Sequence, residues 1–87
     1  MVPVESQILA YIQRRLSAGS LDVSESEIMD AVIPIEHPEY RRRPAYRYGL
    51  RRLHVRGVIN AIDDHKGMRH YFIGSCPSPE LYEAMQR

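Results

Sequence analysis

The stretch YRRRPAYRYGLRRLHVRGVI, from Tyr40 to Ile59, combines a dense positive charge with a helix pattern that ends at a glycine. Pro44 suits a first helical turn, where its missing N–H would have no partner, so we place the start of the helix at Pro44. Gly57 is expected to end it in a left-handed conformation. Advancing 100° per residue puts one narrow row on the side that a helix buries: Tyr46, Leu50, Leu53 and Gly57.

The whole-chain composition hides the charge of this stretch. The 87 residues have a formal net charge of only +1. Residues 40–56 hold seven arginines and no acidic residue, whereas residues 1–39 hold two arginines and seven acidic residues. A guanidinium group matches phosphate oxygens and the acceptor pair of guanine better than an ammonium group does. The sequence therefore predicts a strongly cationic face on a nearly neutral protein.

Periodicity and capping predict the elements before this helix. Residues 4–18 have apolar side chains at helical spacing, and residues 21–23 alternate as a very short strand would. Ser24 and Glu27 have the spacing of a capping box, in which each side chain satisfies a free backbone N–H, so a second helix is expected over residues 25–33.

Prolines and β-rich runs organise the rest of the chain. The proline-containing connector of residues 34–43 is expected to hold a turn or a short helical piece. Two runs rich in β-branched and aromatic residues, VINAID and MRHYFI, are predicted strands around the turn DHKG. Tyr71 and Ile73 share one face of the second strand and are expected to be buried. A short helix follows from Pro79, capped by Ser78, with an apolar stripe: Leu81, Ala84 and Met85.

The order helix, short strand, helix, helix, strand, turn, strand resembles the winged helix-turn-helix family. The likeness covers residues 5–73 and is carried by LRRLHVRGVI at residues 50–59 and GMRHYFI at residues 67–73. In that family the recognition helix commonly ends in a leucine pair, a basic residue and glycine. The hairpin that follows is called the wing, and its return strand has a pattern that four residues here match in kind: Gly67, Arg69, Tyr71 and Ile73.

This resemblance implies an α+β fold of the winged-helix type. It consists of a three-helix core with a short strand and a C-terminal β-hairpin wing, over residues 1–74. Residues 75–87 would form a linker and a short C-terminal helix. That helix could pack back over the first helix or form a twofold dimer, and we favour the dimer, through Leu81, Tyr82 and Met85.

The implied function is binding of double-stranded DNA, as a transcriptional regulator or a comparable factor of a virus or mobile element. Arginines that face outward without acidic partners would repel one another unless a polyanion is bound. We expect the three arginines of residues 41–43 to contact phosphates, and Tyr48, Arg51 and Arg52, with Val55, to face base edges. The predicted DNA-binding residues are Arg41, Arg42, Arg43, Arg47, Tyr48, Arg51, Arg52, Lys66 and Arg69.

Other interpretations of these residues stay open. The arginines could instead pair with acids of the same chain, such as Glu27, Asp30, Glu36 and Glu39. They could also dock an acidic protein partner or a structured RNA. Tyr48 could contact a thymine methyl group or simply pack on Arg52, and Lys66 and Arg69 could reach DNA or only keep the hairpin soluble.

Two further features carry structural expectations. Asp63 and Asp64 are expected to stand at the tip of the hairpin, where they would repel phosphate. Gly49 lies inside the arginine-rich helix at a cost of about 1 kcal/mol relative to alanine. Such a glycine suggests close approach of the second helix.

Catalysis, metal binding and membrane insertion find no support in the sequence. Separations of five and six residues between His65, His70 and Cys76 do not match a structural zinc pattern, and no glycine-rich phosphate loop is present. We therefore expect neither an enzyme nor a cofactor. A single cysteine and the absence of a long apolar run indicate a cytoplasmic protein.

Overall fold

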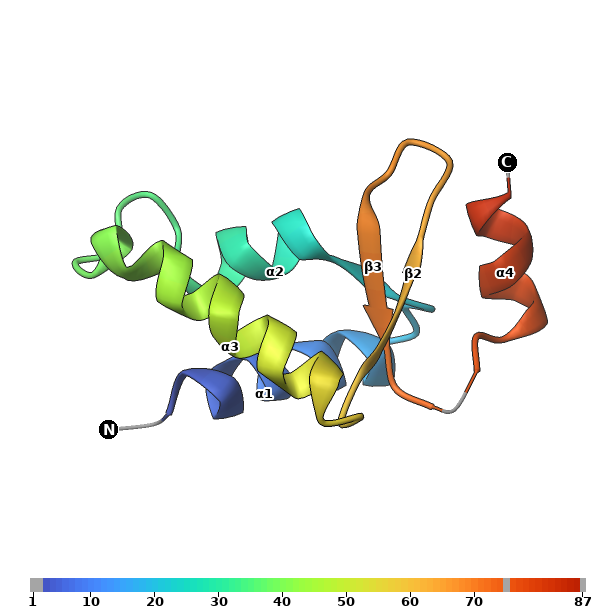
Figure 1. The fold of residues 1–87 in the computed structure, drawn as a ribbon, viewed down its shortest axis with the longest axis horizontal. Coiled ribbons are helices and arrows are strands. Elements are labelled where there is room, and N and C mark those ends of the chain that lie inside the picture. Colours follow the sequence, from blue (N-terminus) through green and yellow to red (C-terminus); the bar gives the residue numbers. More distant parts are fainter. Residues whose placement is uncertain (1–2, 75, 87) are drawn as a thin grey trace.

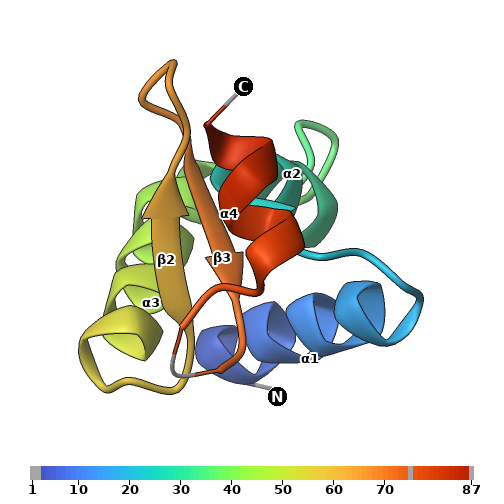
Figure 2. The same ribbon diagram turned by 90° about the vertical axis from the view of Figure 1, so that its right-hand side faces the viewer.

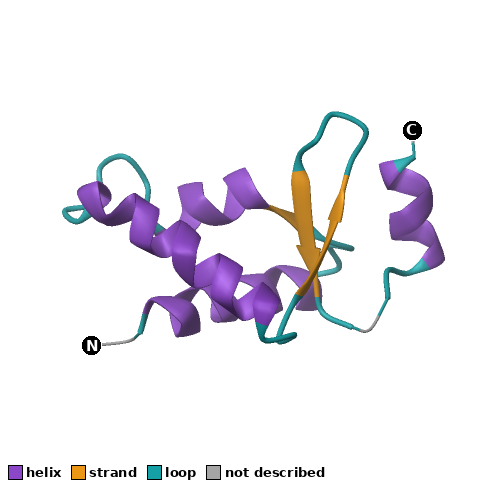
Figure 3. Ribbon diagram, in the orientation of Figure 1, coloured by secondary structure: helices purple, strands orange, loops and turns teal. Residues whose placement is uncertain are grey.

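The computed structural model describes residues 3–74 and 76–86, and these form four α-helices, a short 3-10 helix and a small antiparallel sheet (Figures 1 and 3). The elements in chain order are α1 (Val4–Ser17), β1 (Val23–Ser24), α2 (Glu25–Val32), η1 (Tyr40–Arg42), α3 (Arg43–Val55), β2 (Asn60–Asp63), β3 (Arg69–Phe72) and α4 (Pro79–Met85). The predicted α+β class and the predicted order of elements are confirmed. No helix in the described residues combines the length and apolar character needed to cross a membrane.

Local signals account for the helix ends. The backbone N–H of Glu27 donates to Ser24 Oγ at 3.2 Å, which is the predicted cap of α2. Helix α3 begins at Arg43, one residue earlier than predicted, because η1 runs directly into it and fills the end of the connector. Gly57 has a φ of 78°, a left-handed conformation that glycine adopts without the steric cost of a side chain.

The sheet has the strand order β1–β3–β2, with both pairs antiparallel. Val23 pairs with Tyr71, and Asn60 pairs with Phe72. The hairpin formed by β2 and β3 projects beyond the helices, as Figures 1 and 2 both show. Strand β1 leads directly into α2 and pairs with β3, so it joins the start of α2 to the hairpin.

Helices α1, α2 and α3 cover one face of the sheet. The main buried cluster is Ile8, Ile12, Val23, Ile28, Leu50, Leu53, Ile59 and Tyr71. Tyr46 belongs to a smaller cluster with Met29 and Ile33, between α2 and α3. The predicted buried side of α3 is therefore confirmed for Tyr46, Leu50 and Leu53.

Helix α4 covers the opposite face of the sheet (Figure 2). Leu81 and Met85 pack there with Phe72, and Ile62 lies against them. The predicted burial of Tyr71 is confirmed, but that of Ile73 is wrong: Ile73 is 46% exposed and Phe72 only 5%. Strand β3 ends at Phe72, so the alternation does not reach Ile73, and α4 buries the face that alternation left to solvent.

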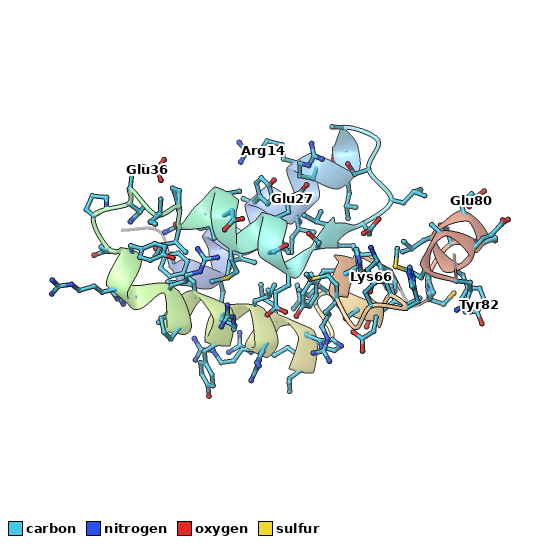
Figure 4. The ribbon with its side chains drawn as sticks, turned by 90° about the horizontal axis from the view of Figure 1, so that it is seen from above. Arg14, Glu27, Glu36, Lys66, Glu80 and Tyr82 are labelled. Atoms are coloured by element: carbon cyan, nitrogen blue, oxygen red, sulfur yellow. The ribbon has the colours of Figure 1, made fainter. Side chains whose placement is uncertain are left out.

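The structure bears out some of the expectations for α4 and not others. Its capping serine is confirmed, because Ser78 Oγ accepts the backbone N–H of Leu81 at 3.2 Å. Leu81 and Met85 are buried against the sheet of their own chain, whereas Ala84 is exposed. Of the three residues expected at a dimer contact, Tyr82 alone is exposed, and Figure 4 labels it at the edge of α4. The dimer stays a prediction.

Gly49 marks a close approach, but to α1 rather than to α2. A Cβ atom on Gly49 would lie 3.1 Å from Val4 Cγ1 and 3.5 Å from Glu5 Cγ. The expectation that the second helix approaches Gly49 is therefore wrong. The missing side chain brings the first turn of α1 against the middle of α3.

Candidate nucleic-acid interface

The outer face of α3 lies opposite its buried row. We define it by five exposed side chains, Arg47, Tyr48, Arg51, Arg52 and Val55. In Figure 4, α1 and α2 lie on one side of α3, and side chains of α3 project from its opposite side. One of these side chains is apolar: Val55 is 86% exposed. Tyr48, Arg51, Arg52, Val55 and Arg56 line a shallow depression of about 450 Å³.

Most arginines of the cationic stretch have an acidic partner in the same chain. In the described residues, five of the seven form ion pairs: Arg42 with Glu39 (3.6 Å), Arg43 with Asp30 (2.9 Å), Arg47 with Glu25 (3.7 Å), Arg52 with Glu5 (2.5 Å) and Arg56 with Glu5 (2.9 Å). The alternative of pairing within the chain is thus confirmed for Asp30 and Glu39. It is wrong for Glu27, which pairs with Arg15 at 3.6 Å, and for Glu36, which forms no ion pair among the described residues.

The ion pair of Arg43 has a structural role. The guanidinium group of Arg43 donates to the carbonyl oxygen of Ile33 at 3.2 Å and to Asp30 at 2.9 Å, and it lies 5.4 Å from the ring centroid of Tyr40. Arg43 therefore fastens the connector between α2 and α3, which leaves it poorly placed for the phosphate contact expected of it.

The pairs of Arg42 and Arg47 are longer, and the side chains of both arginines are about half exposed. Exposed ion pairs contribute about 0–1 kcal/mol each, because water and salt screen them. A ligand with several phosphates could displace the carboxylate from either arginine at small cost.

Arg41 and Arg51 are exposed and form no ion pair in the part of the chain that the structure describes. Arg51 lies beside Tyr48 at two neighbouring depressions of the outer face. The guanidinium group of Arg52 lies 5.1 Å from the ring centroid of Tyr48, so the alternative in which Tyr48 packs on Arg52 is present. Stacking of this kind presets the directions of both side chains.

Glu5 and Arg56 are the residues at this face that the sequence did not single out as a site. Both oxygens of the Glu5 carboxylate are engaged, one by Arg52 and the other by Arg56. The interior glycine at position 49 was a signal that some backbone comes close. It could not identify α1 as the element, nor Glu5 as the side chain that α1 brings.

Asp64 organises the turn of the hairpin. Its Oδ1 accepts the backbone N–H groups of Lys66 (2.8 Å) and Met68 (3.0 Å), and its Oδ2 lies 2.8 Å from His70 Nε2. The hydrogen bond to His70 and those to the two backbone N–H groups lower the pKa of Asp64 to about 2. The carboxylate of Asp64 is thus engaged by the turn and by His70, and the expected repulsion of phosphate at the tip stays a prediction.

His70 links this turn to the chain before β1. Its Nδ1 lies 2.6 Å from Asp22 Oδ2, so the imidazole bridges Asp22 and Asp64. Partial burial alone would lower the pKa of His70, but the hydrogen bonds to Asp64 and Asp22 outweigh it and raise the pKa above 6.5. His70 is half-buried and helps to hold the hairpin through these two contacts.

The two basic residues predicted on the hairpin differ. Lys66 is exposed on the turn, where Figure 4 labels it. Arg69 Nε lies 3.3 Å from Asp63 Oδ1, so these two charges balance each other. Among the described residues, no three histidine, cysteine, aspartate or glutamate side chains are arranged to hold a metal ion.

Comparison with known proteins identifies no relative: no family model, no curated protein sequence and no solved structure matches this chain.

Proposed function

We propose that this chain is a winged-helix protein that binds double-stranded DNA, with α3 as the recognition helix and the β2–β3 hairpin as the wing. The observation that carries the proposal is the outer face of α3. It presents Arg51 without a carboxylate partner among the described residues, beside the exposed side chains of Tyr48 and Val55, on a helix whose back is buried. A single exposed helix face of this width suits the major groove.

We propose different roles for the predicted residues. Arg51, Tyr48 and Val55 would face base edges, where a guanidinium group reads guanine and an apolar group contacts a thymine methyl. Arg41, Arg42 and Arg47 would contact phosphates. For Arg42 and Arg47, a phosphate would replace the carboxylate of a weak ion pair. Lys66 would add a contact from the hairpin. Arg43 and Arg69 would support the interface from within the chain.

The experiment is a titration of labelled duplexes of random sequence by fluorescence anisotropy, at several salt concentrations. About four neutralised phosphates would give a slope of log affinity against log salt of about −4. Selection of bound duplexes from the same pool should then enrich a site. A slope near zero would remove the proposal.

Arg51→Ala is the sharpest variant for the same titration. It should weaken binding to the enriched site by about 10- to 100-fold, the usual cost of one lost base contact from arginine. Arg14→Ala is the matched control, since Arg14 is also exposed but lies on α1, away from the outer face of α3 (Figure 4). Equal losses for both variants would indicate a general charge effect.

A second candidate function is docking of an acidic protein partner. The observation that favours it is the number of arginines on this surface that already bind carboxylates. The double variant Arg51→Ala, Arg52→Ala separates the two functions. Unchanged duplex affinity with loss of a protein partner would support docking, and preference for a folded RNA over duplex DNA would favour an RNA ligand.

A further inference from the structure

Two arginines near the end of α3 converge on one carboxylate. Arg52 Nη2 lies 2.5 Å from Glu5 Oε1, and Arg56 Nη1 lies 2.9 Å from Glu5 Oε2. Arg52 and Arg56 are four residues apart and so lie on the same side of the helix, where their charges would repel each other. The carboxylate satisfies both and leaves one net positive charge on the trio.

The position of Glu5 is fixed, whereas the arginines can move. Glu5 stands in the first turn of α1, which Gly49 allows to pack against α3, and its side chain is only 18% exposed. The side chains of Arg52 and Arg56 are 51% and 61% exposed. Each guanidinium group can therefore turn toward solvent by rotation about its own side-chain bonds, without movement of the backbone.

The chemistry of this pair suits a phosphate. Two guanidinium groups at hydrogen-bond distance from two oxygens of one anion are the arrangement by which arginines bind carboxylates and phosphates alike. Arg52, which belongs to the outer face of α3, lies over the ring of Tyr48 and also reaches Glu5. A phosphate beside that face would compete with Glu5 for the same donors.

We infer that Arg52 and Arg56 form a phosphate-binding pair that Glu5 occupies in the free protein. This inference rests on the proposed binding of duplex DNA and adds a regulatory contact to it. Glu5 acts as an internal competitor: it withholds two cations from any duplex, whatever its sequence, and so limits sequence-independent affinity. Base-edge contacts from Arg51 are unaffected, because Arg51 has no part in the pair.

The test compares Glu5→Gln with Glu27→Gln. Both variants lose one negative charge from an ion-paired glutamate, but Glu27 pairs with Arg15, and Figure 4 places it on the side of α1 and α2. In anisotropy titrations with random duplexes at low salt, Glu5→Gln should bind about fivefold more tightly than the wild type, because Arg52 and Arg56 then have no surface ion pair to give up and each such pair is weak. Its salt slope should steepen by about 0.9 for each phosphate newly contacted. Glu27→Gln should change affinity by less than about twofold.

Equal gains for the two glutamine variants would overturn the inference, and so would weaker binding by Glu5→Gln. Glu5→Asp keeps the charge but shortens the side chain by one methylene, so it should also bind duplexes more tightly, and it serves if Glu5→Gln fails to fold. Failure of the wild type to bind any duplex would instead remove the proposed function.

The pair can also be tested without DNA. Inorganic phosphate should shift the side-chain N–H resonances of Arg52 and Arg56 in Glu5→Gln or Glu5→Asp at concentrations that leave those of the wild type unchanged. Identical titration curves in the wild type and the variant would overturn the phosphate-binding pair, even if duplex binding itself is established.

Discussion

The outer face of α3 and the β2–β3 hairpin are both rich in charged side chains, but their charges are balanced in different ways. On α3, Arg51 has no carboxylate partner among the described residues, and Arg47 Nε lies 3.7 Å from its partner oxygen, Glu25 Oε1. On the hairpin, Asp64 caps the turn, His70 bridges two aspartates and Arg69 pairs with Asp63. Attraction for a polyanion is therefore expected at α3, whereas the charged side chains of the hairpin mainly stabilise the conformation of the hairpin itself.

Different elements pack against α3 and against the hairpin. Helix α3 is held from behind by α1 and α2, which contribute side chains to the same buried cluster as Leu50 and Leu53. The hairpin is held by the main core on one face and by α4 on the other, through Phe72 and Ile62. The hairpin should consequently keep its position in the free protein, so that α3 and the hairpin present one preformed surface.

The largest effect is expected from removing the support of α4. Leu81→Ala should lower the free energy of unfolding by about 2–4 kcal/mol, because Leu81 is almost completely buried against the sheet. Urea denaturation at two protein concentrations measures this loss. The exposed Tyr82 on the same helix gives the control, since Tyr82→Ala should change stability by less than about 0.5 kcal/mol. A wild-type midpoint that rises with protein concentration would show that α4 stabilises a dimer instead.

The charge network of the hairpin should make stability depend on pH. Because the pKa of His70 is raised above 6.5 in the folded chain, its protonated form stabilises the fold in full below pH 6.5. This contribution is lost as the pH rises through the raised pKa. Urea denaturation of the wild type from pH 6 upward, at about half-unit intervals, should show the decline.

His70→Gln removes the titrating group, so its stability should stay flat over the same range. Asp64 has a pKa of about 2 and remains ionised throughout, so it adds no slope there. A parallel decline in the variant would assign the pH dependence to another group and would weaken the contrast between hairpin and helix.

The smallest effect is expected at the tip of the hairpin. Lys66→Ala removes one exposed cation that contacts at most a single phosphate, so duplex affinity should fall by less than about threefold. The salt slope should become shallower by less than about 1. A loss of affinity as large as that of Arg51→Ala would mean that the hairpin contributes as much to duplex binding as α3 does.

Local sequence determined much of this protein. The capping of α2 by Ser24, the left-handed Gly57 and the buried row of Tyr46, Leu50 and Leu53 all follow from spacing within a few residues, and all are confirmed. Helical periodicity and capping act between neighbours in the chain, so they can be recognised without knowing the fold. The exposed arginines of α3 were predictable for the same reason.

Tertiary structure alone decided which elements meet. The burial of Phe72 in place of Ile73 depended on α4 packing against the second face of the sheet. The orientation of the Asp64 side chain depended on its contact with His70 on β3, and the pairing of Glu5 with Arg52 and Arg56 depended on α1 packing at Gly49. These contacts join residues that are distant in the chain or lie on different elements, and a charged side chain has no periodicity that reveals its partner.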